Sequence, residues 1–247
     1  MMEGMTQRFD CSDDAQRREG IAAAGTAIRA GKLVILPTDT VYGVAADAFT
    51  PRAITGLLAA KGRGRAMPVP VLIADVDTLE GVATNLGPAV RLLTRACWPG
   101  GLTLIVEHPP SLAWDLGDGQ GTVAVRVPDD DLARDLLRET GPLGVSSANR
   151  SGRPPARTAD EAVEALGDAV EVVLDDGPRA NGEPSTIVDC TVDPPRVLRI
   201  GAVSQNRLHY LVPTLRTVTA GPPHPEPTPA QSEPTAAPAT PEEQPNT

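Results

Sequence analysis

Residues 33–43 read L-V-I-L-P-T-D-T-V-Y-G, a short apolar run that ends in a cluster of hydroxyl and carboxylate groups. The four apolar residues are typical of a strand buried on both faces, as in the sheets of α/β proteins. The polar residues then fall at the carboxyl end of that strand, where open α/β sheets bind their ligands. A turn in which Asp39 only closes the backbone explains the same residues without a ligand.

Strand-like and helix-like segments alternate along the chain, although some strands follow one another directly. Ser12 is the expected N-cap of a helix that runs to Ala30, and Thr50 that of a helix ending at Lys61. The alternation indicates an α/β fold, and the adjacent strands indicate a mixed sheet. Further helices are expected at 88–97, 132–138 and 158–166, and further strands at 69–74, 102–106, 122–127, 143–146, 170–174, 186–189 and 196–200.

The end of the 247-residue chain differs in composition from the rest. Residues 219–247 contain nine prolines and four glutamates but no Lys, Arg, Leu, Ile, Val or aromatic residue. Such a segment cannot bury enough apolar surface to offset the entropy of ordering it. We therefore expect an N-terminal extension at 1–12, one folded domain at 13–210 and a Pro-rich disordered tail at 211–247.

The formal net charge of −10 includes −4 from the glutamates of this tail. The acidic balance argues against a broad nucleic-acid surface, because binding to a phosphate backbone requires a basic face. Cys11, Cys97 and Cys190 are too widely spaced to predict a disulfide framework or a zinc site. No stretch approaches the roughly 20 apolar residues of a membrane helix, so we expect a soluble cytoplasmic protein.

Two cations stand beside a glycine at the end of the second expected helix, in Lys61-Gly62-Arg63. Cations there complement the helix C-terminus, which is a sufficient structural reason for them. Lys61 and Arg63 could equally clamp phosphates or a carboxylate, since arginine offers a planar fork and lysine a mobile point charge. The residue order of a Walker A motif is absent.

Two arginines, Arg126 and Arg199, interrupt expected strands. If buried, each needs an anionic partner, which is either a ligand or a structural carboxylate. The polar residues 146–149 end another strand and Ser185 precedes one, and either turn chemistry or ligand binding explains them. The three histidines stand apart from any Ser or Cys cluster, so a hydrolase triad is not expected.

Together these segments resemble the YrdC/TsaC family of L-threonylcarbamoyladenylate synthases. The resemblance covers roughly residues 15–205, and it is specific because the motifs occur in family order. They are P-T-D-T-V-Y-G-V at 37–44, K-G-R at 61–63, W-P-G-G-L-T at 98–103, T-V-A-V-R-V-P at 122–128, S-S-A-N-R-S-G-R-P at 146–154, S-T-I-V-D at 185–189 and L-R-I-G at 198–201.

The resemblance implies the YrdC-type α/β fold, an open twisted mixed β-sheet with flanking helices and a large concave cationic cavity. It implies a nucleotidyltransferase that converts L-threonine, bicarbonate and ATP, with Mg²⁺ accompanying the ATP, into threonylcarbamoyl-AMP and pyrophosphate. Other proteins of the tRNA modification pathway would then transfer the threonylcarbamoyl group to the adenosine next to the anticodon, so tRNA would be an indirect partner. The chain resembles the short, single-domain type.

The motif positions also imply roles for individual residues. Catalysis would fall to Lys61 and Arg63, and no metal ligand is predicted. The threonine would be bound by Thr40, Thr122, Arg126 and Ser147. The nucleotide would be bound by Arg63, Asn149, Arg157, Ser185 and Arg199.

Three positions depart from the family pattern: relatives often have Asn at Met67, His at Leu72 and Pro at Ser146. Met67 could offer a nucleotide only backbone or packing contacts. Two other functions stay open, namely a YrdC-like module that binds RNA without making the adenylate and a carbamoyl-transfer domain like that of hydrogenase-maturation proteins. The acidic balance and the scarcity of aromatic residues count against the first, and the missing acylphosphatase and zinc-finger segments against the second.

Overall fold

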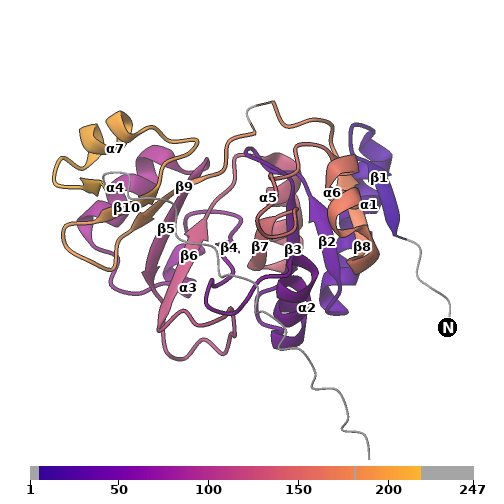
Figure 1. Cartoon of the computed structure of the whole chain (residues 1–247), viewed down its shortest axis with the longest axis horizontal. Coiled ribbons are helices and arrows are strands. Elements are labelled where there is room, and N and C mark those ends of the chain that lie inside the picture. The colour runs from indigo at the N-terminus through magenta and orange to yellow at the C-terminus, as the bar shows by residue number, and fades with distance from the viewer. Residues whose placement is uncertain (1–5, 181, 218–247) are drawn as a thin grey trace, which may run out of the picture.

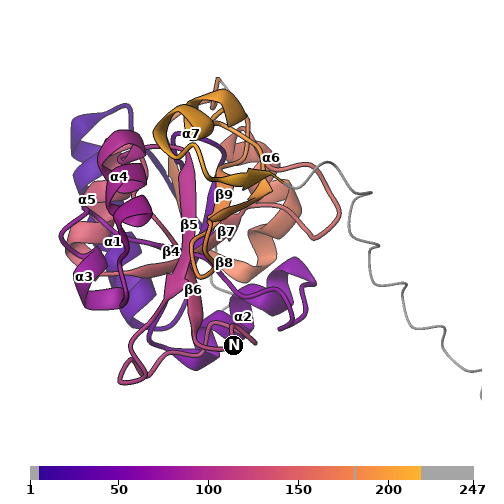
Figure 2. The same cartoon turned by 90° about the vertical axis from the view of Figure 1, so that its left-hand side faces the viewer.

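The computed structural model describes residues 6–180 and 182–217. In this part of the chain, eleven strands form one mixed sheet in the order β1-β8-β2-β3-β7-β4-β6-β5-β9-β10-β11 (Figure 1). Figure 2 shows these strands between a helix layer with α1, α3, α4 and α5 and another with α2 and α6. The fold is the expected α/β type, an open mixed sheet with flanking helices.

The strands are β1 (Gln7–Asp10), β2 (Leu33–Leu36), β3 (Gly43–Asp47), β4 (Val71–Leu72), β5 (Leu102–Glu107), β6 (Thr122–Arg126), β7 (Leu143–Ser147), β8 (Val170–Asp175), β9 (Thr186–Asp189), β10 (Arg196–Arg199) and β11 (Arg216–Thr217). The helices are α1 (Asp14–Arg29), α2 (Pro51–Lys61), α3 (Leu79–Val82), α4 (Pro88–Cys97), α5 (Asp131–Thr140), α6 (Ala159–Leu166) and α7 (Gln205–Leu211), with a 3-10 turn η1 (Gly167–Ala169).

Strand β2 confirms the expectation drawn from its four apolar residues, because all four are buried. Leu33 and Ile35 belong to one apolar cluster, together with residues of α2 and α6. Val34 and Leu36 belong to a second cluster, together with residues of α1 and α5. The strand is therefore apolar throughout because helices cover both faces of the sheet at this point.

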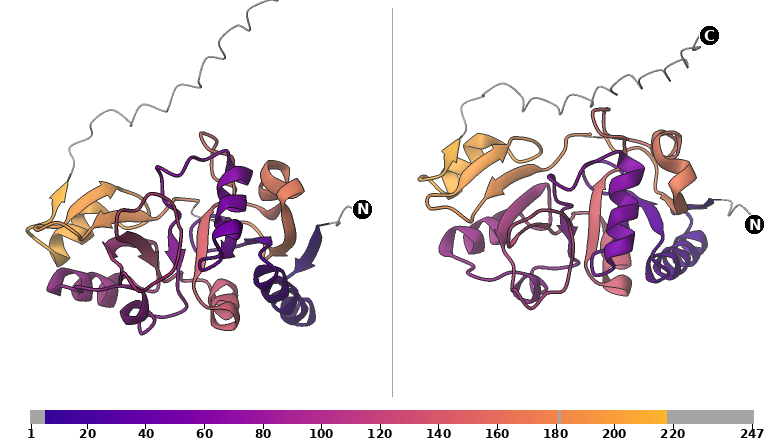
Figure 3. Two further views of the ribbon diagram at one scale, coloured as in Figure 1. Left: turned by 90° about the horizontal axis from the view of Figure 1, so that it is seen from below. Right: turned by 60° about the horizontal axis from the view of Figure 1, so that its bottom comes forward.

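The sheet extends beyond the expected domain boundaries at both ends. Strands β1 and β11 form its two edges, at opposite ends of the molecule (Figure 3). Strand β1 lies within the expected extension and pairs in parallel with β8. Helix α7 and β11 continue the fold past residue 210, since Leu208, Val212 and Leu215 bury their side chains in the main core. Residues 218–247 of the expected tail lie outside the described residues.

Some local details differ from the sequence-based expectation. Asp13 rather than Ser12 caps α1, accepting hydrogen bonds from two backbone N–H groups, while the Ser12 hydroxyl donates to Asp10. The strand expected at 69–74 is reduced to two residues after Pro70, which has no N–H to donate to a sheet. Among the described helices, none has the length and apolarity needed to cross a bilayer.

Candidate functional site

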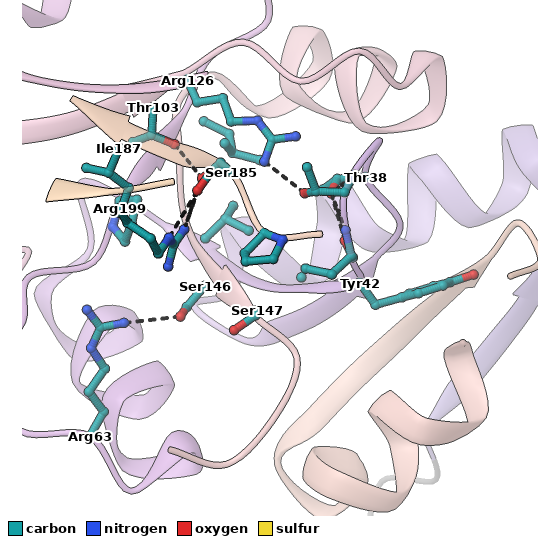
Figure 4. A pocket seen from close by; sticks show the side chains of 17 residues that line it. Thr38, Tyr42, Arg63, Thr103, Arg126, Ser146, Ser147, Ser185, Ile187 and Arg199 are labelled. Atoms are coloured by element: carbon teal, nitrogen blue, oxygen red, sulfur yellow. Dashed lines mark hydrogen bonds between the residues drawn. The ribbon is translucent and has the colours of Figure 1, made fainter. Parts of the chain in front are cut away.

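A cavity brings together the loop after β2, the end of β7, Arg63 just after α2, and residues of the β4-β6-β5-β9-β10 part of the sheet (Figure 4). Three arginines line it, and none of the described lining residues is acidic. The cavity is therefore cationic, as expected. Six of the ten residues expected at the site line it. Hydroxyl and guanidinium groups come from Thr38, Thr40, Arg63, Thr103, Arg126, Ser146, Ser147, Ser185 and Arg199.

Arg126, the last residue of β6, is buried in the wall of the cavity. Its Nε donates to the carbonyl of Gly100 at 2.9 Å, and one terminal nitrogen donates to the Thr40 hydroxyl at 2.9 Å. The other terminal nitrogen is ion-paired with Asp39. Burial lowers the pKa of Arg126, and the charge of Asp39 opposes that shift. The buried cation thus has a structural carboxylate, and it still has N–H groups to spare for a ligand.

Arg63 and Arg199 differ from Arg126, because no carboxylate in the described part of the chain pairs with them. Arg63 donates to the Ser146 hydroxyl at 3.3 Å and to the Pro68 carbonyl at 3.0 Å, and its buried Nε has no partner there. Burial and the charge of Arg199 lower the pKa of Arg63. Burial and the charge of Arg126 lower that of Arg199. Arg63 is half-buried and Arg199 is exposed, and two cations that repel each other in this way favour a polyanionic ligand.

Ser185 lies in the wall of the cavity, next to Thr103 and Arg199 (Figure 4). Its hydroxyl accepts from Thr103 at 2.8 Å and from Arg199 at 3.2 Å, while its carbonyl accepts from two Arg199 nitrogens at 2.8 and 3.0 Å. The sequence pointed to the polar residues 146–149 without giving Ser146 a role of its own, and it did not single out Thr103. Their neighbours in the motifs at 98–103 and 146–154 were the available signal.

Lys61 does not line the cavity, although α2 ends beside it. The ammonium is buried and donates to the carbonyls of Ser147 at 2.5 Å and Asn149 at 2.7 Å. Burial and the nearby Arg63 lower the pKa of Lys61 to about 8. The geometry is therefore that of an anchor for the turn after β7, rather than the mobile charge suggested by the sequence.

Three other expected residues also lie away from the cavity lining. Thr122 shares a strand with Arg126 but lies about 13 Å away at about 3.3 Å per residue, and its hydroxyl donates to Gly119. Asn149 is buried, its Nδ2 donates to the carbonyls of Arg150 and Arg153, and its Oδ1 has no hydrogen-bond partner in the described structure. Arg157 is exposed beside Gly182. The alternation of side chains predicted that Thr122 and Arg126 share one face of β6. It could not predict that only Arg126, at the end of the strand, reaches the cavity.

Tyr42 connects the segments that form the site. Its N–H donates to Ala156 at 2.9 Å and its carbonyl accepts from Ala148 at 2.8 Å. Its hydroxyl, at the other end of a fully buried side chain, lies 2.8 Å from the Gly177 carbonyl and 3.2 Å from an Asp175 oxygen. One residue thus ties the loop after β2 to the loops after β7 and β8.

Gly201 allows the end of β10 to approach Ser185, and we expect Gly201→Ala to destabilise the fold. A Cβ there would lie 2.0 Å from the Pro184 carbonyl oxygen, so the two backbones would have to separate. Overpacking of this kind costs about 1–3 kcal/mol. Thermal unfolding measures the loss, with Gly56→Ala as the control, because a Cβ at Gly56 in α2 meets no atom within 4 Å. An unchanged melting temperature for Gly201→Ala would contradict the close approach.

Known proteins resemble this chain in sequence and in fold. The Sua5/YciO/YrdC family model, described as telomere recombination, matches residues 26–201. A Mycobacterium tuberculosis protein, named provisionally as a threonylcarbamoyl-AMP synthase, is 54% identical over 204 residues, which cover 83% of this chain and 94% of that protein. The threonylcarbamoyl-AMP synthase of Bacillus subtilis is 36% identical over 194 residues, which cover 78% of this chain and 56% of that protein.

A solved structure extends the similarity to three dimensions. Pyrococcus abyssi Sua5 complexed with L-threonine superposes with a TM-score of 0.78 at 31% sequence identity. The superposition covers 87% of this chain and 62% of that one. The chain therefore spans less than two thirds of the length of the P. abyssi and B. subtilis proteins.

Proposed function

Because the chain belongs to the Sua5/YciO/YrdC family, we propose that it makes threonylcarbamoyl-AMP and pyrophosphate from L-threonine, bicarbonate and ATP. The single observation that supports this most directly is a cavity with three arginines and, among its described lining residues, no carboxylate. All three substrates bring negative charge to one place, so a cavity for them must be cationic. The names of the relatives at 54% and 36% identity agree with this activity.

The two ends of the cavity suit different substrates. Arg63 and Arg199, without carboxylate partners in the described structure, suit the phosphates of ATP. Arg126 with Thr40, near Ser147, suits the carboxylate and hydroxyl of threonine. Asn149 and Arg157 are assigned to the nucleotide and Thr122 to threonine only from the family resemblance, since none of them lines the cavity.

The chemistry has two steps and classes the enzyme as a nucleotidyltransferase. The amine of threonine bonds to the carbon of bicarbonate with loss of water, which gives a carbamate. A carbamate oxygen then attacks the α-phosphorus of ATP, and pyrophosphate leaves. Fixed arginines and hydroxyls position the reactants and neutralise charge, so no covalent intermediate with the protein is required.

Mg²⁺ would accompany the ATP. Within the described residues, no group of three or more His, Cys, Asp or Glu side chains could hold a metal ion. Phosphate oxygens and water would therefore supply most of its ligands, which is the usual way that Mg²⁺ binds nucleotides. The product would pass to threonylcarbamoyl-transfer proteins that modify tRNA, so the protein would act in the cytoplasm and tRNA would be an indirect partner.

Pyrophosphate release tests the proposed function. Purified protein is supplied with ATP, Mg²⁺ and bicarbonate, with and without L-threonine, and the adduct is identified by mass spectrometry. Release that requires both threonine and bicarbonate is expected. A folded protein that releases no pyrophosphate but binds tRNA in a salt-sensitive manner would instead be an RNA-binding module, and release with carbamoyl phosphate in place of threonine would indicate a carbamoyl-transfer domain.

Affinity for ATP is expected to fall as the pH rises through about 8. Below that pH Lys61 carries its proton and adds a positive charge beside Arg63, and above it the charge is lost. An anion favours the protonated form, so ATP binding at pH 8 should be accompanied by proton uptake. Calorimetry in two buffers with different ionisation enthalpies measures both effects. An affinity for ATP that stays constant from pH 7 to 9.5, without proton uptake, would contradict the prediction that the charge of Lys61 supports ATP binding.

A further inference from the structure

We propose that Asp39 is a positioning residue for threonine, which acts by holding the guanidinium of Arg126 in place. This inference rests on the proposed function. The inference goes beyond the proposed function, because Asp39 is absent from the cavity lining and from the residues to which the family resemblance gives a role. Asp39 follows β2 in the polar loop, and Arg126 ends β6, so the contact joins two distant parts of the chain.

The contacts of Arg126 use each of its nitrogens once. Nε donates to Gly100, one terminal nitrogen to Thr40 and the other to Asp39. The three contacts together fix the orientation of the guanidinium plane, and the Asp39 contact is the one of the three made by a charged group. Two N–H groups of the five remain, one on each terminal nitrogen, and their directions follow from that plane.

Burial makes the carboxylate necessary. The Arg126 side chain is only 7% exposed and that of Asp39 only 16%. A buried cation without an anion either reaches for water or draws in another anion, and the cost of an unpaired buried charge is high. The charge of Arg126 lowers the pKa of Arg199, so the two cations repel each other. Without Asp39, the charge of Asp130 would be left to stabilise the Arg126 cation. The guanidinium would then leave the Thr40 hydroxyl.

The charge of Asp39 also distinguishes the two ends of the cavity. In the described structure, Arg63 and Arg199 have no carboxylate partner, whereas the charge of Arg126 is balanced. A neutralised arginine binds a single carboxylate by directed hydrogen bonds without attracting a polyphosphate strongly. Asp39 therefore supports the binding of a zwitterionic amino acid at the Arg126 end.

The test measures steady-state pyrophosphate release by Asp39→Asn with threonine and ATP varied separately. We expect the KM for threonine to rise about tenfold or more, and the KM for ATP to change by less than about threefold. Asp39→Glu, which restores the charge, should recover part of the threonine affinity. Asp189→Asn is the matched control, because Asp189 also has a largely buried side chain paired with an arginine, but that arginine, Arg196, does not line the cavity, whereas Arg126 does.

A double-mutant cycle then shows whether Asp39 acts through Arg126. Threonine affinity is measured by calorimetry for Asp39→Asn, Arg126→Met and the double variant. Asp39→Asn should have little further effect once Arg126 is replaced. An unchanged threonine KM in Asp39→Asn, or equal effects with and without Arg126, would overturn the role of Asp39. A wild-type protein without threonine-dependent release would overturn the proposed function itself.

Discussion

Arg63→Ala is expected to lower the rate of threonine-dependent pyrophosphate release about 100-fold or more while the protein stays folded. Arg63 lines the cavity, its Nε is buried without a partner in the described structure, and its side chain contacts only neutral oxygens. The half-buried Arg63 guanidinium therefore has an unused N–H donor and no counter-charge, so it is available to bind a phosphate. Removal of one such group typically costs a factor of 10²–10³.

Arg65→Ala is the matched control for this variant. Arg65 lies two residues further along, is exposed, and is ion-paired with Asp115 and Asp118. Loss of the Arg65 side chain should leave the rate within about twofold, since exposed ion pairs contribute little to the stability of a protein. Circular dichroism and thermal unfolding of both variants establish that they are folded. Full activity in Arg63→Ala would remove Arg63 from the phosphate site.

Lys61→Met is expected to reduce activity about 100-fold for a different reason. The ammonium holds the carbonyls of Ser147 and Asn149, so its loss removes one hydrogen bond from each and lets the turn after β7 move. The Ser147 carbonyl would keep the N–H of Asn149 as a donor. It also removes a charge beside Arg63. The melting temperature should fall as well, by the equivalent of about 1–3 kcal/mol, because methionine fills the space but donates no hydrogen bond.

Lys32→Met provides the comparison, because Lys32 is the only other lysine in the chain. It is exposed, and its ammonium lies 3.9 Å from a Glu171 oxygen. This variant should match the wild type in both activity and melting temperature. If Lys61→Met lost activity with its melting temperature and pyrophosphate affinity unchanged, the anchoring role would be wrong and a direct catalytic role would be favoured.

The sequence predicted the order of most helices and strands because burial on both faces gives strands such as β2 a distinctive apolar run. It did not predict β3, whose residues G-V-A-A-D are small and weakly strand-forming. The small residues have a packing reason, since a Cβ on Gly43 would lie 2.7 Å from Val145 of the neighbouring β7. Tertiary contact, rather than local preference, makes this segment a strand.

The site could be predicted only in part, because a motif identifies neighbours in sequence and not the direction of a side chain. Arg126 was expected to need an anion, and Asp39 meets that need, yet nothing in the spacing joins the two residues. Lys61 was expected to face a ligand, and it faces backbone carbonyls instead. The family resemblance identified the segments correctly, while the fold decides which residue of each segment reaches the cavity.

The arginines that attract ATP also have a consequence for turnover. The Arg63 and Arg199 end of the cavity relieves the same mutual repulsion when it holds pyrophosphate as when it holds the triphosphate. Pyrophosphate should therefore inhibit by remaining bound, and its departure, rather than bond formation, should limit the rate at saturating substrate. A rapid first turnover followed by a slower steady rate of threonylcarbamoyl-AMP formation would then be the kinetic signature of slow pyrophosphate release.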